Sequence, residues 1–126
     1  MGVHFSATGD ESAMIVTSPS YLGHETEGTG IFVGSCRLDD LHYDVPPTYI
    51  KMDVEGVEPD ALWGAREIIK KHSPILAITA YHEAEHLWTL PLLMHALQPE
   101  YKLFFRRYAE ATFEIVWYAV PKNRIR

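Results

Sequence analysis

The stretch Tyr49-Ile-Lys-Met-Asp-Val-Glu-Gly-Val-Glu58 decides the fold of this chain. Its first residues are typical of a buried strand, Gly56 permits a tight turn, and Pro59 suits the first turn of a helix. Open α/β sheets bind their ligands at the carboxyl ends of strands, where Asp53 and Glu55 lie in this sequence. Carboxylates there also lie beside the positive end of the following helix dipole. The turn is therefore the first candidate for a functional site.

The rest of the chain predicts alternating strands and helices within a single domain, residues 1–126. Apolar residues recur at helical spacing in 59–72 and 87–97, with Pro91 as a break or kink in the second helix. The predicted strands cover 3–7, 13–17, 31–38, 48–54, 75–80, 101–108 and 112–120. This order predicts an α/β fold with a mostly parallel sheet and an antiparallel C-terminal hairpin.

Composition excludes several classes of function. The net charge of -6 argues against nucleic acid as a partner, because phosphate binding requires a cationic surface. No segment approaches the roughly 20 apolar residues of a membrane-spanning helix, so no membrane partner is expected. Cys36 is the only cysteine, which excludes an internal disulfide and favours a cytoplasmic location.

Several motifs resemble the C-terminal half of the FkbM-type methyltransferase family. They are Arg37-Leu-Asp-Asp-Leu41, Ile50-Lys-Met-Asp-Val-Glu-Gly-Val-Glu58, Trp63-Gly-Ala-Arg-Glu-Ile-Ile69, Tyr81-His82 and the closing hairpin at 101–121. The resemblance covers residues 3–121 and implies part of a class I methyltransferase (Rossmann-like) fold. It also implies S-adenosylmethionine as cofactor and O-methylation of a small-molecule hydroxyl, on a sugar or a secondary metabolite.

The glycine-rich cofactor loop of such enzymes has no counterpart in this sequence. The run Gly28-Thr-Gly-Ile-Phe-Val-Gly34 follows polar residues and leads into a strand rather than a helix. We therefore expect a truncated or incomplete methyltransferase domain. The strand missing from the family's sheet would border strand 48–54, which leaves an apolar edge that favours homo-oligomers. A non-enzymatic α/β domain that associates through this edge is the alternative.

The resemblance also implies roles for particular residues. Asp53, Glu55 and His82 form the predicted catalytic set, in which His82 accepts a proton from the substrate hydroxyl with assistance from Glu55. An imidazole is suited to this role because it ordinarily titrates near neutral pH. Asp53 orients the substrate or binds a divalent metal, and Asp53 and Asp10 are the predicted cofactor contacts. Glu58 is expected to place charge at the helix start. No metal site is assigned from the sequence.

Two other interpretations remain open at this stage. The acids could simply cap the helix while His82 ends a strand. Alternatively, His82-Glu-Ala-Glu-His86 matches the HExxH pattern of zinc proteases, with Glu83 as base and a distant glutamate (Glu100, Glu110 or Glu114) as third ligand. That pattern requires both histidines on one helix, whereas strand 75–80 places His82 at a junction. We expect His86 to be a solvent-exposed helical residue.

Overall fold

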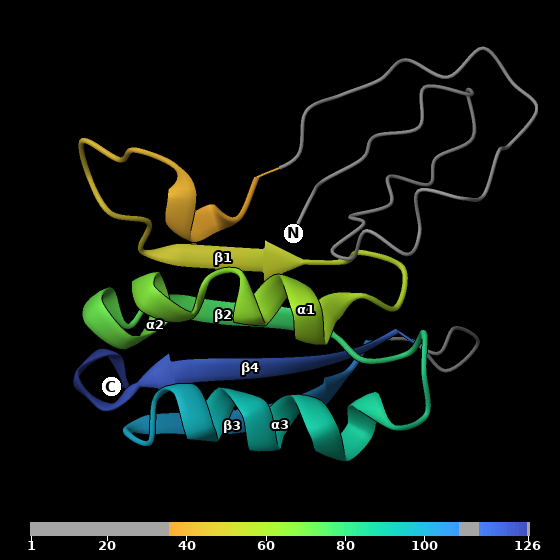
Figure 1. Ribbon diagram of the computed structural model, residues 1–126. Coiled ribbons are helices and arrows are strands. Elements are labelled where there is room, and N and C mark those ends of the chain that lie inside the picture. The colour runs from red at the N-terminus through yellow and green to blue at the C-terminus, as the bar shows by residue number, and fades with distance from the viewer. Residues whose placement is uncertain (1–35, 109–113, 126) are drawn as a thin grey trace, which may run out of the picture.

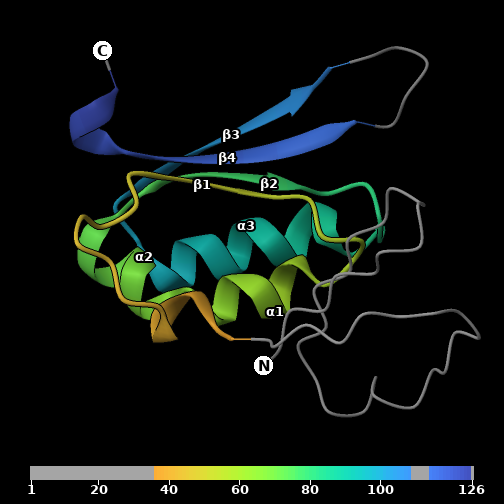
Figure 2. The same ribbon diagram turned by 90° about the horizontal axis from the view of Figure 1, so that it is seen from above.

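Three helices cover one face of a four-stranded sheet in the computed structural model, which describes residues 36–108 and 114–125 (Figures 1 and 2). The strands are β1 (Tyr49–Met52), β2 (Ile75–Thr79), β3 (Tyr101–Arg107) and β4 (Ile115–Pro121). The helices are α1 (Glu58–Trp63), α2 (Arg66–His72) and α3 (His86–Leu97), with short 3-10 helices η2 (Leu38–Asp40) and η3 (Lys122–Arg124). Predicted strands 3–7 and 13–17 lie outside the described residues. The described end of predicted strand 31–38 is not a strand, because Leu38 already begins η2.

The sheet has the order β1-β2-β4-β3. β1 and β2 are parallel, whereas β4 is antiparallel to both of its neighbours, β2 and β3. Among the described strands, the expectation of a mostly parallel sheet is therefore not confirmed, because β4 inserts between β2 and β3. The α/β class and the C-terminal hairpin are both present, although β3 rather than β4 forms the outer edge.

The predicted helix 59–72 is two helices, α1 and α2, separated at Gly64 and Ala65. The segment around η2 explains the break. The backbone N–H of Asp39 donates to the carbonyl of Gly64 at 3.0 Å, and the Asp39 carboxylate accepts hydrogen bonds from the N–H groups of Glu67 and Ile68 at 3.1 and 3.0 Å. Asp39 thus caps the start of α2 from a distant segment, since the N-cap residue itself, Ala65, has no side-chain oxygen.

The core lies between the helices and the sheet. Leu76 and Ile78 of β2 are completely buried, as are Leu90 and Met94 of α3. α3 runs without interruption through Pro91, so the predicted break there is not observed. None of the described helices is long and apolar enough to cross a bilayer.

β1 is an edge strand of the described sheet, with β2 as its partner on one side. Its side chains alternate, so that Ile50 and Met52 are buried while Tyr49 and Lys51 are exposed. An apolar cavity of about 390 Å³ borders β1 and is lined in part by Tyr43 and the η2 segment. This is the edge that the sequence predicted to be open.

Candidate functional site

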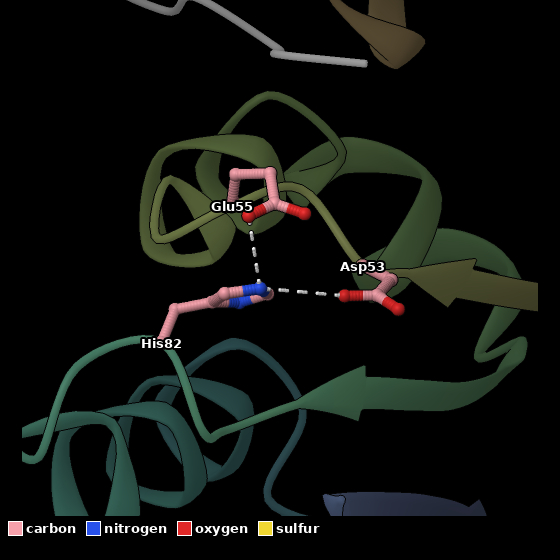
Figure 3. Close-up of side chains that lie close together, drawn as sticks. All are labelled: Asp53, Glu55 and His82. Atoms are coloured by element: carbon pink, nitrogen blue, oxygen red, sulfur yellow. Dashed lines mark ion pairs between the residues drawn. The ribbon is translucent and has the colours of Figure 1, made fainter. Parts of the chain in front are cut away.

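The turn after β1 and the turn after β2 meet at one edge of the sheet, because parallel neighbours end on the same side. Asp53 and Glu55 come from the first turn and His82 from the second, and their side chains converge (Figure 3). The first turn contains left-handed backbone at Glu55 (φ 56°) and at Gly56 (φ 96°). Glycine adopts the second of these angles without a Cβ penalty.

The imidazole of His82 lies between the two carboxylates. Its Nε2 atom is 3.4 Å from Oε2 of Glu55 and 3.7 Å from Oδ1 of Asp53. The three potential ligand atoms lie within 4.8 Å of one another. The His82 side chain is only 11% exposed, whereas the Asp53 and Glu55 side chains are 36% and 48% exposed. The structure thus brings together the three residues of the predicted catalytic set, and their chemical roles stay predictions.

Glu58 is a site residue that the sequence reasoning missed. Its side chain is completely buried, and Oε1 accepts hydrogen bonds from the Val54 N–H at 3.1 Å and the Thr79 hydroxyl at 3.2 Å. The same oxygen lies 2.9 Å from Nδ1 of His82. Glu58 lies in the first turn of α1, as expected, and it also orients the imidazole, a role that the sequence did not indicate. The available signal was its position, three residues after Glu55 and directly before Pro59.

His86 also differs from its prediction. It is buried rather than solvent-exposed, and its Nδ1 lies 3.4 Å from the second oxygen of Glu58, Oε2. The first residue of α3 is His86, so His82 precedes that helix. Both imidazoles direct Nδ1 toward the same buried carboxylate, which is not the arrangement of two zinc ligands on one helix. The HExxH match does not produce a protease site.

Asp53 is held by the Tyr81 hydroxyl, with the Thr79 hydroxyl close by. The Tyr81 hydroxyl donates to Oδ1 of Asp53 at 3.0 Å, and the Thr79 hydroxyl lies 3.2 Å from the same oxygen. Burial, together with the hydrogen bond to Asp53, raises the pKa of Tyr81 to about 12. The phenol therefore stays a neutral donor throughout the physiological range and fixes the carboxylate in place.

Nε2 of His82 is buried yet has no hydrogen-bond partner among the described residues. The partner of Nδ1 is a carboxylate oxygen, which can only accept, so the Nδ1 atom carries the proton in the neutral ring. This tautomer leaves a lone pair on Nε2, directed toward the space beside Asp53 and Glu55. The site therefore presents a fixed basic nitrogen beside two carboxylates.

Comparison with known proteins places the chain in a family. The family model of the methyltransferase FkbM domain matches residues 2–110. The chain belongs to the FkbM methyltransferase family. A similar solved structure is the crystal structure of methyltransferase FkbM from Methylobacillus flagellatus KT, with 38% sequence identity and a TM-score of 0.61. No curated protein matches the chain.

Membership in the FkbM family confirms the resemblance predicted from the motifs. The match to the Methylobacillus structure covers 66% of this chain but only 22% of that protein, so the chain spans less than a quarter of the relative's length. Asp10, the other predicted cofactor contact, lies outside the described residues.

Proposed function

We propose that this chain is the acceptor-side part of an S-adenosylmethionine-dependent O-methyltransferase. Its acceptor would be a hydroxyl group on a small molecule, such as a sugar or a secondary metabolite. The observation that supports this proposal is the His82 imidazole, which the buried Glu58 carboxylate holds with Nε2 facing Asp53 and Glu55. Family membership supports methyl transfer, and the site supplies a group that can receive a proton.

The described residues can prepare the acceptor in three ways. Nε2 of His82 accepts the hydroxyl proton, and the Nδ1 hydrogen bond to Glu58 stabilises the imidazolium that forms. The Asp53 carboxylate, fixed by Tyr81, accepts a hydrogen bond from a neighbouring hydroxyl and so orients the acceptor. The Glu55 carboxylate lies 3.4 Å from Nε2 and adds negative charge beside the imidazolium once it has formed.

The described residues do not form a complete cofactor site. S-adenosylmethionine supplies an electrophilic methyl group, and class I enzymes hold it with a glycine-rich turn and an acid that binds the ribose. Residues 36–108 and 114–125 contain no glycine-rich strand-to-helix turn, since Gly56 is flanked by Glu55 and Val57 rather than by further glycines. The contacts of Asp53 and Asp10 with the cofactor stay proposals.

Two experiments test this function. Calorimetric titration of S-adenosylmethionine into the purified chain measures whether it binds the cofactor alone. Transfer of labelled methyl from S-adenosylmethionine to a panel of hydroxylated sugars and metabolites is then measured in a longer protein that carries this segment. His82→Ala and Asp53→Ala should each abolish transfer, whereas Glu85→Gln, an exposed carboxylate of the same loop, should leave it unchanged. Near-normal turnover in both alanine variants would remove these residues from the mechanism.

The edge of β1 favours a second candidate, an association domain. Among the described strands, β1 has one partner only, and the 390 Å³ cavity beside it has a mostly apolar lining. Unpaired edges of this kind recruit another chain. Light scattering at micromolar concentration tests the idea, and a clean monomer would argue against it.

A further inference from the structure

We infer that Asp53, Glu55 and His82 form a binding site for one divalent transition-metal ion. The inference deepens the proposed function, because it concerns the same site and rests on it for its chemical purpose. Cation binding is nevertheless a property of this chain alone and can be measured without methyl transfer.

Three acceptors converge on one point without a donor between them. Nδ1–H of His82 donates to Glu58, so the lone pair of Nε2 faces Oε2 of Glu55 at 3.4 Å and Oδ1 of Asp53 at 3.7 Å. Nε2 is buried and has no hydrogen-bond partner among the described residues. A buried polar atom without a partner costs about 1–3 kcal/mol. A cation at this point would satisfy the nitrogen and remove the repulsion between the acceptors.

The spacing of the three atoms suits a small cation. Zinc lies about 2.0–2.2 Å from imidazole nitrogen and carboxylate oxygen, so two ligands at a tetrahedral angle are separated by about 3.4 Å. The Nε2–Glu55 distance of 3.4 Å equals this value, and the Nε2–Asp53 distance of 3.7 Å requires only a small side-chain rotation. All three ligand atoms lie within 4.8 Å of one another.

The surroundings of these ligands resemble those of a metal centre. Metal-binding histidines typically donate their other ring N–H to a carboxylate, which fixes the ring orientation. Glu58 does this for His82 at 2.9 Å, from a completely buried position. The hydrogen bond from Tyr81 similarly fixes Asp53. Each of these two ligands is therefore already held in place by a neighbour.

The types of ligand indicate which ion would bind and what that ion would do for the acceptor. One imidazole with two carboxylates favours Mn²⁺ or Zn²⁺ over Mg²⁺, which prefers oxygen ligands alone. Because Asp53 and Glu55 are partly exposed, positions on the ion stay open to water or to an acceptor hydroxyl. A cation there lowers the pKa of a bound hydroxyl. With the ion bound, Nε2 of His82 would be a ligand and the proton of the acceptor hydroxyl would pass to water, whereas without the ion Nε2 would accept that proton itself.

Calorimetric titration of MnCl₂ and ZnCl₂ into the chain tests the inference. We expect one ion per chain, with Zn²⁺ binding more tightly than Mn²⁺ and Mg²⁺ weakest. Glu55→Gln and Asp53→Asn should each weaken Mn²⁺ binding at least tenfold. Both substitutions preserve shape, and Asn keeps the oxygen that accepts from Tyr81, so circular dichroism and thermal melts should confirm that the variants fold.

Matched controls separate this site from adventitious binding. Glu85→Gln removes an exposed carboxylate near the site, and His95→Gln removes an exposed imidazole of α3, so neither should change the affinity. Absence of binding, or equal affinity in the wild type, Glu55→Gln and Asp53→Asn, would overturn the inference. If the chain binds the cation but the longer protein does not transfer methyl groups, the proposed function is refuted and the cation site is not. If the chain binds no cation and methyl transfer continues in the presence of a chelator, the cation site is refuted and the proposed function is not.

Discussion

Replacement of Glu58 by alanine should destabilise this protein more than most single substitutions do. The Glu58 carboxylate is completely buried, and one of its oxygens is within hydrogen-bond distance of the Val54 N–H, the Thr79 hydroxyl and Nδ1 of His82. The variant would leave the Val54 and His82 donors unpaired in a buried environment. The second oxygen of Glu58 faces His86, so the substitution would also remove the anion that the imidazoles of His82 and His86 share.

The size of the effect follows from the two hydrogen-bond donors that would have no alternative acceptor. A buried donor left without its partner costs about 1–3 kcal/mol, and the Val54 N–H and His82 Nδ1 both fall in this class. The Thr79 hydroxyl adds little, because it can turn to the Met52 carbonyl, 3.3 Å away. Together these terms predict a loss of about 2–6 kcal/mol in the free energy of unfolding, a range that includes the usual cost of about 3–5 kcal/mol for removing one partner of a buried charged pair. A domain of ordinary stability has only about 5–15 kcal/mol in total.

Urea denaturation followed by tryptophan fluorescence measures this loss. Glu58→Gln is the matched variant, because its amide oxygen can replace the acceptor while its NH₂ group faces His86, and it should cost about 1–2 kcal/mol. If Glu58→Ala fails to fold, the glutamine variant still tests the reasoning. A cost below about 1 kcal/mol for Glu58→Ala, or equal costs for the two variants, would refute the assignment of Glu58 as the buried anchor.

Three further predictions concern the elements around the site. Asp39→Ala removes the cap of α2, including the bond from the Glu67 N–H, and should lower the free energy of unfolding by about 1–2 kcal/mol in urea titrations, whereas Asp39→Asn should cost less. Gly56→Ala places a Cβ on backbone at φ 96°, where neighbouring atoms leave room but the conformation is strained. The variant should lose about 1–3 kcal/mol of stability, measured by thermal denaturation. An unchanged stability would contradict the turn geometry. Tyr81 should ionise only near pH 12, so its neutral hydrogen bond to Asp53 stabilises the fold below about pH 10 and is lost as the pH rises through 12. Absorbance titration at the phenolate band should show Tyr81→Phe and wild type diverging only near pH 12, and divergence centred near pH 10 would contradict this.

The strand-turn-helix segment was predictable because its signals are local. Apolar alternation, Gly56 and Pro59 define β1, the turn and α1 within a dozen residues, and the predicted parallel pairing then places His82 beside Asp53. The break between α1 and α2 was not predictable in the same way. It depends on Asp39, whose carboxylate reaches the start of α2 from 28 and 29 residues away in sequence. Helical periodicity alone continues across Gly64.

The burial of Glu58 and His86 shows a second limit of prediction from sequence. A glutamate before a proline at a helix start normally indicates a solvent-exposed dipole interaction, and a histidine in the first turn of a helix is normally exposed. Both residues are buried here, and Oε2 of Glu58 lies 3.4 Å from Nδ1 of His86, although neither atom has a hydrogen-bond partner among the described residues. Such a pair can be recognised only once the fold shows that two segments distant in sequence lie side by side. The HExxH match was misleading for the same reason, because its two histidines share a carboxylate rather than an open metal position.

The turn after β1 divides its acids between two tasks, and this division can be tested with one pair of variants. Glu58 points inward, accepts the Val54 N–H that closes the turn and holds His82, so the shape of the turn and the orientation of the imidazole depend on the same carboxylate. Glu55 points outward, is half exposed and contacts Nε2 of His82. Glu55→Gln should therefore lower the Mn²⁺ affinity while the free energy of unfolding changes by less than about 0.5 kcal/mol, as is usual for a surface substitution. Glu58→Ala should lower both quantities, because a mispositioned imidazole binds the ion poorly. Parallel loss of stability and affinity in Glu55→Gln would mean that the outer carboxylate also holds the turn together, and the division of tasks would fail.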